Sequence, residues 1–150
     1  MKVLATCALL GLVSACGPGN SLGGSISQSY SLNFSTVLIE QQGTQLLIEY
    51  LENLSIGTDD VCKIVVDTSN LTIPPNSTMN DDTFLNRVTI QRVSNQGGDF
   101  PPVDRGQIHF DDFQFKAGGH ISGNFQAVFH SGQDVNGDFN DDHITEISTQ

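Results

Sequence analysis

Residues 121–129 show the clearest alternation of polar and apolar positions in the chain. Apolar or small side chains stand at every second position, and mainly Ser, Asn and Gln stand between them. Residues 133–139 repeat this alternation, with Val135 and Phe139 on the apolar side. Because successive side chains of a strand point to opposite faces of a sheet, each segment is predicted to be a half-buried β-strand.

These two strands are predicted to form a hairpin that turns at residues 130–132. An odd loop length keeps both apolar faces on the same side, and Gly132 suits the left-handed position of a three-residue loop. In this register Phe125 faces Gly137 across the strand pair. Gly123 then faces Phe139, so that each phenylalanine covers a glycine, and a larger side chain at Gly123 is expected to overpack the face.

The preceding hairpin is predicted to turn at residues 117–119, which places Phe113 opposite Gly123. The apolar pattern shifts by one position at Asp111-Asp112, and one extra residue there restores the apolar face. That shift indicates a β-bulge. Because bulges can lie beside functional sites, a metal site formed by His109 and Asp111 is an alternative to an exposed strand face.

Four more segments have strand or strand-like patterns. Residues 45–54 also fit one face of a helix, but the flanking strand patterns and a turn at Gly43 favour a strand. The other three carry alternation or short apolar runs and are predicted strands at 29–35, 61–67 and 88–93. Pro, Gly and paired Asp residues predict loops at 71–82 and 97–102.

These segments predict one all-β domain. About eight strands with short connections form an antiparallel meander, folded as a sandwich or a flattened barrel, after an N-terminal signal helix. A chain of 150 residues suits a single domain with a modest core.

The N-terminus carries an export signal. Lys2 precedes a short apolar stretch, residues 3–13, which is too short to span a membrane and has the length of a signal-peptide core. The stretch ends in Val13-Ser14-Ala15-Cys16, which resembles the lipobox of bacterial lipoproteins at each of its four positions. Cys7 is the competing candidate, but Thr6 precedes it and the apolar core before it is too short.

Resemblance to the lipoproteins implies a diacylglyceryl group on the thiol of Cys16 and cleavage just before it. Two or three acyl chains hold a protein on a membrane far more firmly than one. In that family an Asp directly after the cysteine favours retention of the protein in the inner membrane. Gly17 at this position therefore implies sorting to the outer membrane, on either its periplasmic or its exposed side. The expected organisation is a signal peptide at 1–15, a lipidated flexible tether at 16–25, and a β-domain at 26–150.

Charge excludes one class of partner. The chain has 17 acidic and 6 basic residues and a net charge of −11, which would repel nucleic acid. The membrane, reached through the lipid on Cys16, is the expected partner, and a protein or ligand partner is left open. Cys62 would be the only cysteine left unmodified, and its apolar surroundings predict a buried, inert thiol.

One motif near the C-terminus has the spacing of metal ligands. Oxygen-bearing side chains occupy four alternate positions, namely Asp134, Asn136, Asp138 and Asn140. They resemble the first half of a calcium loop of the EF-hand or dockerin type. Phe139 stands where that loop needs Gly, and Thr145 stands where it needs Glu. We therefore expect the solvent face of a strand, with calcium binding absent or millimolar.

Enzyme chemistry is not indicated. No nucleophile motif is present. The histidines are scattered along the chain without the spacing of metal ligands, at positions His109, His120, His130 and His143. Three Asp pairs occur besides the pair at the bulge, namely Asp59-Asp60, Asp81-Asp82 and Asp141-Asp142. Most of these residues are expected to lie in loops and to be solvated. No cofactor is expected.

The leading hypothesis is a non-enzymatic binding or structural β-domain of an envelope lipoprotein. The repeated Gly-x-Phe at 123–125 and 137–139 loosely resembles uncharacterised envelope β-domain lipoproteins. One alternative is a calycin-like carrier of an apolar ligand, which requires a void lined with small residues. Another is a small hydrolase, which requires Asp and His residues that converge in a cleft. A core filled with Phe favours the leading hypothesis.

Overall fold

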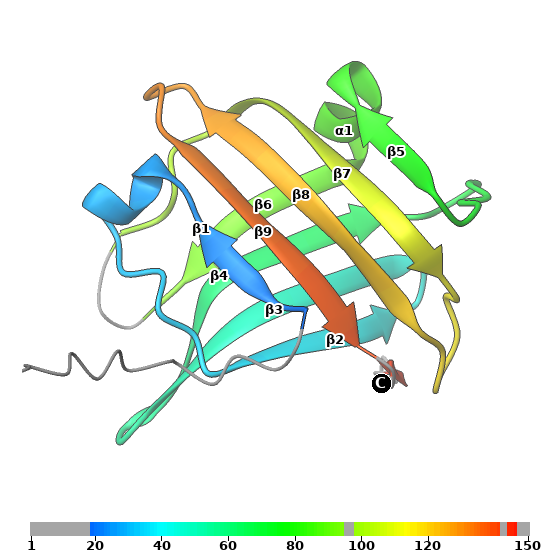
Figure 1. Ribbon diagram of the computed structural model, residues 1–150, viewed down its shortest axis with the longest axis horizontal. Coiled ribbons are helices and arrows are strands. Elements are labelled where there is room, and N and C mark those ends of the chain that lie inside the picture. The colour runs from blue at the N-terminus through cyan, green and yellow to red at the C-terminus, as the bar shows by residue number, and fades with distance from the viewer. Residues whose placement is uncertain (1–18, 95–97, 142–143, 147–150) are drawn as a thin grey trace, which may run out of the picture.

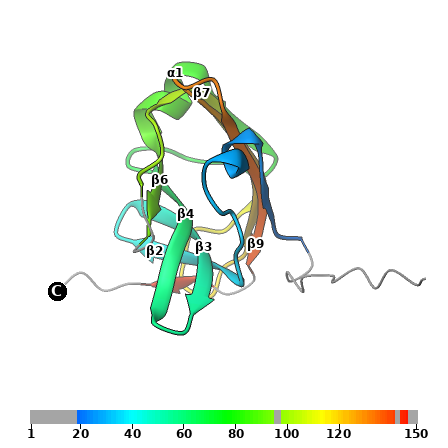
Figure 2. The same ribbon diagram turned by 90° about the vertical axis from the view of Figure 1, so that its left-hand side faces the viewer.

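In a computed structural model, ten strands of the described residues form two five-stranded sheets that face each other (Figures 1 and 2). The structure describes residues 19–94, 98–141 and 144–146. The predicted all-β fold is confirmed, and the sandwich is the architecture observed. The predicted signal helix and Cys16 lie outside the described residues.

Sheet A is antiparallel throughout and has the strand order β1-β9-β8-β7-β5. Its strands are β1 (Ser21–Gly23), β5 (Ser77–Asn80), β7 (Val103–Phe113), β8 (Ile121–Phe129) and β9 (Asp134–Asp141). Because β7, β8 and β9 follow one another in both sequence and space, this part of the sheet is the predicted meander.

Sheet B has the strand order β10-β2-β3-β4-β6, and β10 pairs with β2 in parallel. Its strands are β2 (Thr36–Gln42), β3 (Gln45–Leu54), β4 (Gly57–Asp67), β6 (Val88–Val93) and β10 (Thr145–Glu146). A 3-10 helix, η1 (Ser25–Gln28), and a short helix, α1 (Asp81–Arg87), complete the fold. The strand predicted at 45–54 is therefore confirmed, and the helix alternative is wrong.

The predicted register of the β8–β9 hairpin is confirmed. Phe125 pairs with Gly137 and Gly123 pairs with Phe139. The amide of Gly132 donates to the carbonyl of Phe129 over 2.8 Å, and Gly132 has the left-handed φ of 84°. The turn therefore closes through the residue that the sequence pattern assigned to it.

The predicted register of the β7–β8 hairpin is wrong. Phe113 pairs with Ile121, and Phe110 is the residue opposite Gly123. The bulge at Asp111-Asp112 is confirmed, since the pairing shifts between Phe110 and Asp112. The loop is longer than expected, since the last pair is Phe113 with Ile121, and within it the amide of Gly118 donates to the carbonyl of Ile144 from the far end of the chain.

Three other segments differ from their predictions. Residues 29–35 alternate as expected but form no strand, and segment 71–82 contains β5 and the start of α1 instead of a continuous loop. Residues 98–102 of the second predicted loop are irregular, as expected. The segment expected to be a flexible tether, 16–25, contributes β1, which pairs with β9.

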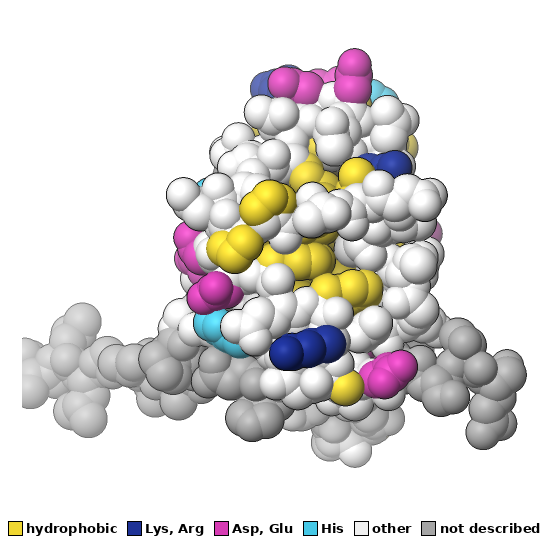
Figure 3. Space-filling model, turned by 90° about the vertical axis from the view of Figure 1, so that its right-hand side faces the viewer, with side chains coloured by type: hydrophobic (Ala, Val, Ile, Leu, Met, Phe, Trp, Pro, Cys, Tyr) yellow, Lys and Arg dark blue, Asp and Glu magenta, His cyan; other side chains and the backbone are white. Residues whose placement is uncertain are grey.

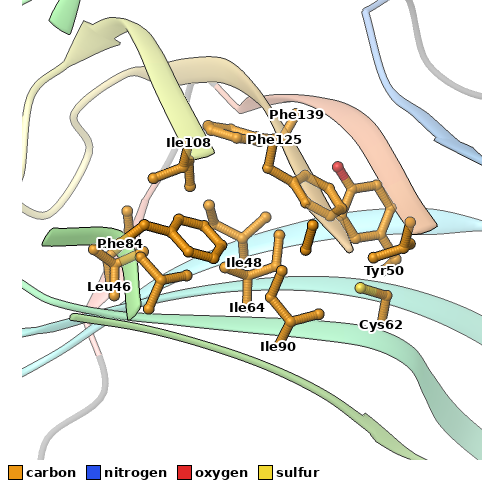
Figure 4. Packing of buried hydrophobic residues seen from close by; sticks show 14 of the residues in the cluster. Leu46, Ile48, Tyr50, Cys62, Ile64, Phe84, Ile90, Ile108, Phe125 and Phe139 are labelled. Atoms are coloured by element: carbon orange, nitrogen blue, oxygen red, sulfur yellow. The ribbon is translucent and has the colours of Figure 1, made fainter. Parts of the chain in front are cut away.

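Large apolar side chains fill the space between the sheets (Figure 4). Phe84 of α1 is fully buried and points between the two layers at one end of the sandwich. A Cβ atom at Gly106 of β7 would lie 2.4 Å from the Phe84 ring, so glycine is required there to admit α1. Burial of a phenylalanine side chain stabilises a fold by about 1.5–3 kcal/mol.

Tyr50 of β3 connects the two sheets. Its side chain is fully buried, and its hydroxyl donates to the carbonyl of Asp138 on β9 over 2.8 Å. Its ring lies edge-on to Phe34 at 5.1 Å and 6.0 Å from the ring of Phe125. Burial raises the pKa of Tyr50 well above its usual value, so the phenol remains a hydrogen-bond donor at any physiological pH.

Gly123→Ala is expected to destabilise the domain by about 1–3 kcal/mol, because the packing there leaves no room for a larger side chain. An added Cβ atom would lie 2.0 Å from the carbonyl oxygen of His109 and 2.9 Å from the ring of Phe139. Urea unfolding of the two proteins measures the difference. The neighbouring Ser122→Ala is the control and should change stability by less than about 0.5 kcal/mol. Equal stability of the two variants would contradict the packing described.

Candidate binding face

The outer face of sheet A carries polar side chains in rows that cross neighbouring strands. Pairing aligns four amide side chains from four strands in the first row, namely Asn136, Gln126, Gln107 and Asn80. All four residues are exposed. Each amide group offers both donors and an acceptor, so the row can form hydrogen bonds with a neutral polar surface.

A second row runs beside the first and reaches all five strands. It consists of Ser21, Asp138, Asn124, His109 and Thr78. Internal hydrogen bonds hold both ends of this row, since the hydroxyl of Ser21 donates to the Asp138 carboxylate over 2.5 Å and the Thr78 hydroxyl lies 2.7 Å from Nδ1 of His109. We call the two rows together the polar face.

The polar face is hollowed in several places. One hollow lies between the two rows and is lined in part by Gln107, Asn124, Gln126 and Asn136. Another lies beside α1 and includes Asn80 and Arg105 in its lining. A further hollow lies at the β1 edge, where Asn20, Ser122, Asp138 and Asn140 contribute to its lining. All three are open to solvent, so the face suits an extended partner better than an enclosed small molecule.

The N-terminal segment is fastened to β9 by reciprocal hydrogen bonds. The amide and hydroxyl of Ser25 both donate to the Asp134 carboxylate, at 3.1 and 2.5 Å, and the amide of Asp134 donates back to the Ser25 hydroxyl. The Ser25 hydroxyl, followed by its amide, holds the pKa of Asp134 below its usual value. The Asp134 carboxylate therefore serves to attach the N-terminal segment to β9.

The calcium-like motif lies on a strand, as expected from its apolar partners. Asp134, Asn136, Asp138 and Asn140 all belong to β9 and lie on its outer face, whereas Val135 and Phe139 are buried. Side chains on one face of a strand follow its straight path, whereas calcium requires ligands that wrap around the ion. Among the described residues, no three His, Cys, Asp or Glu side chains form a group that could hold a metal ion.

The histidines that the structure describes are dispersed, and each of the three lies near a carboxylate. A ring nitrogen lies 3.4 Å from a carboxylate oxygen in the pairs His109–Asp111 and His120–Asp112, and 3.5 Å from one in the pair His130–Asp104. The first pair is the site proposed at the bulge, and the structure brings these two side chains together without a third ligand group around them in the part of the chain it describes. His143 lies outside the described residues.

A buried charged cluster was not anticipated from the sequence. Asp59, expected in a solvated loop, is 3% exposed on β4 and accepts a hydrogen bond of 2.6 Å from Ser94. Arg92 is also buried, lies over the ring of Tyr30, and donates to the carbonyl of Ser31 over 2.8 Å. The two contacts of Arg92 attach segment 29–35 to β6 of sheet B, although the segment forms no strand.

Carboxylates also gather on the outer face of sheet B around Lys63. Lys63 pairs with Glu49, and both side chains are largely buried. Burial, followed by the charge of Glu49, raises the pKa of Glu40 and of Asp60. The cluster therefore consists of three acidic side chains that share one lysine.

Cys62 is fully buried on β4 and free, as predicted. Burial raises the pKa of the thiol far above its usual value. The neutral thiol is a poor nucleophile, so Cys62 contributes to packing.

The polar face could have been identified only in part from sequence. The alternation in 121–129 correctly placed Asn124 and Gln126 on the outside of β8, but it did not show which residues of β5 and β7 lie beside them. Comparison of the chain with protein-family models, curated proteins and solved structures found no match. The geometry of this face and the N-terminal motif are therefore the features that bear on function.

Calcium binding to the purified protein should be absent or millimolar. The carboxylates of Asp134 and Asp138 already accept hydrogen bonds from Ser25 and Ser21, and the ladder of β9 keeps the motif extended. Isothermal titration calorimetry with calcium chloride measures this directly. A micromolar site that disappears in Asp134→Ala would contradict the expectation.

Ser25→Ala should raise the pKa of Asp134 toward its usual value and weaken the domain at neutral pH. A depressed carboxyl pKa stabilises the folded state above the unfolded pKa of about 3.9, and this contribution is lost as pH falls through the folded value. The stability difference from wild type should therefore shrink below about pH 4. Urea unfolding at neutral and acidic pH measures it.

Ser27→Ala is the matched control, because Ser27 is exposed in the same short helix and makes no side-chain hydrogen bond to the described residues. A pH-independent loss of stability in Ser25→Ala would show that the contact with Asp134 is not electrostatic.

Proposed function

We propose that the protein is a lipid-anchored lipoprotein of the bacterial cell envelope and that the polar face of its β-domain binds a neutral, hydrogen-bonding partner. The observation that carries the binding role is the alignment of amide side chains across four strands. A rigid surface of this kind, rich in donors and acceptors, suits a polyhydroxylated polymer such as an envelope polysaccharide. The anchoring role depends on Val13-Ser14-Ala15-Cys16.

Several features support a binding role over the alternatives. Phe and Ile side chains occupy the space between the sheets, where a carrier of an apolar ligand would need a void. The hydrolase alternative has some support from Glu40, Glu49 and Asp60, but Lys63 already pairs with Glu49 there. No helix among the described residues is long and apolar enough to cross a membrane.

Cys16→Ser should leave an unprocessed precursor and abolish incorporation of a fatty-acid probe, because the thiol is the acylated group. Metabolic labelling followed by electrophoresis of the full chain measures both effects. Cys7→Ser is the matched control and should be labelled and cleaved normally. Normal labelling of Cys16→Ser would overturn the anchoring proposal.

A double variant, Gln107→Ala with Gln126→Ala, should reduce binding to insoluble envelope polysaccharide several-fold, because it removes the centre of the amide row. Co-sedimentation of the purified protein with chitin, an insoluble neutral polysaccharide that stands in for the envelope polymer, measures the bound fraction. The control is Thr89→Ala with Gln91→Ala, which removes two exposed polar side chains from the outer face of sheet B. Equal binding by the two variants, or no binding by the wild type, would contradict the assignment of the polar face.

A further inference from the structure

The topology of sheet A fixes the end at which the anchored segment leaves the domain. Strand β1 is antiparallel to β9, and β9 is antiparallel to β8, so β1 runs parallel to β8. The chain therefore enters β1 at the end where β8 begins. The β7–β8 hairpin, residues 114–120, projects from this same end (Figure 1).

The distance between Cys16 and the domain is short. The side-chain oxygen of Asn20 accepts a hydrogen bond of 2.7 Å from the amide of Asn140, at the end of β9. Cys16 precedes Gly19 by three residues, which span about 10 Å at most. Strands β1 and β7 are three positions apart in the sheet order, or about 15 Å. A lipid on Cys16 would therefore hold this end of the sandwich against the bilayer surface.

The two ends of sheet A differ in the side chains that they present. At the β7–β8 end, Phe113 and Phe115 are only partly buried, and their rings are stacked with centroids 5.7 Å apart. Beyond them, Lys116 and Ala117 are exposed. Figure 3 views the molecule from the side of this hairpin and shows apolar side chains gathered in an open patch. The hairpin at the opposite end, residues 130–132, contains only His, Ser and Gly.

We propose that the β7–β8 end of the sandwich rests on a zwitterionic phospholipid surface, the membrane that carries the lipid on Cys16. This inference depends on the proposed lipidation. Lys116 can approach headgroup phosphates, whereas Asp111 and Asp112, with side chains 63% and 48% exposed, can approach headgroup ammonium groups. An anionic bilayer would repel a chain with a net charge of −11, so a zwitterionic surface fits the charge of the protein as a whole.

The test compares the two hairpins of the full, natively processed protein in phosphatidylcholine vesicles. Ala117→Cys and Ser131→Cys each introduce one exposed thiol for an environment-sensitive fluorophore. Cys62 is fully buried, and the Cys16 thiol is consumed by lipid in the proposed protein, so labelling is selective. Vesicles that contain lipids with a nitroxide at the headgroup should quench the label at residue 117 several-fold more than the label at residue 131.

The outcomes separate this inference from the proposed function. Protein that incorporates the fatty-acid probe and floats with vesicles, yet shows equal quenching at both positions, overturns the orientation alone. Protein that lacks the probe and stays in solution overturns both proposals. A dimer in detergent, with the residue 117 labels quenching each other, would assign the apolar end to a second copy of the chain and overturn the membrane contact.

Discussion

The absence of a side chain at Gly137 is the constraint on which the rest of the sandwich depends. A Cβ atom there would lie 2.4 Å from the carbonyl oxygen of Ser21, 2.9 Å from the ring of Phe125 and 3.1 Å from the hydroxyl of Tyr50. One glycine thus admits the edge strand β1, the aromatic ring of the adjacent strand, and the phenol that links the two sheets. Because cores pack as closely as organic crystals, none of the three neighbours has space to retreat.

The packing of the core between the sheets determines the geometry of the polar face on the outside of sheet A. Once Phe125 lies over Gly137 and Phe139 lies over Gly123, the pairing of β8 with β9 cannot slip without turning apolar side chains to solvent. The outward amides of Gln126 and Asn136 are then held side by side. The bulge at Asp111-Asp112 shifts β7 by one residue and brings Gln107 into the same row. The polar face is rigid because it is the reverse side of a packed core.

The sequence predicted those parts of the structure that short-range rules control. The β8–β9 turn closes within itself through Gly132, so parity and turn chemistry were sufficient. The β7–β8 loop is also odd in length, but it bonds to Ile144, which approaches Gly118 and Gly119 from beyond β9, and parity and turn chemistry do not include such a contact. The outward residues of β8 were predicted, whereas their alignment with Asn80 required the pairing of β5, a contact that no local pattern encodes.

The position of β1 has a mechanical consequence. In a chain anchored at Cys16, drag on a bound partner would pull the domain away from the membrane and load β1 along its own axis. Such a force shears all the hydrogen bonds of the strand at once, which resists rupture better than opening them one by one. The side-chain bonds between Asn20 and Asn140 and between Ser25 and Asp134 extend this attachment beyond the three residues of β1. The first residues of the domain would then transmit tension between the envelope and the membrane.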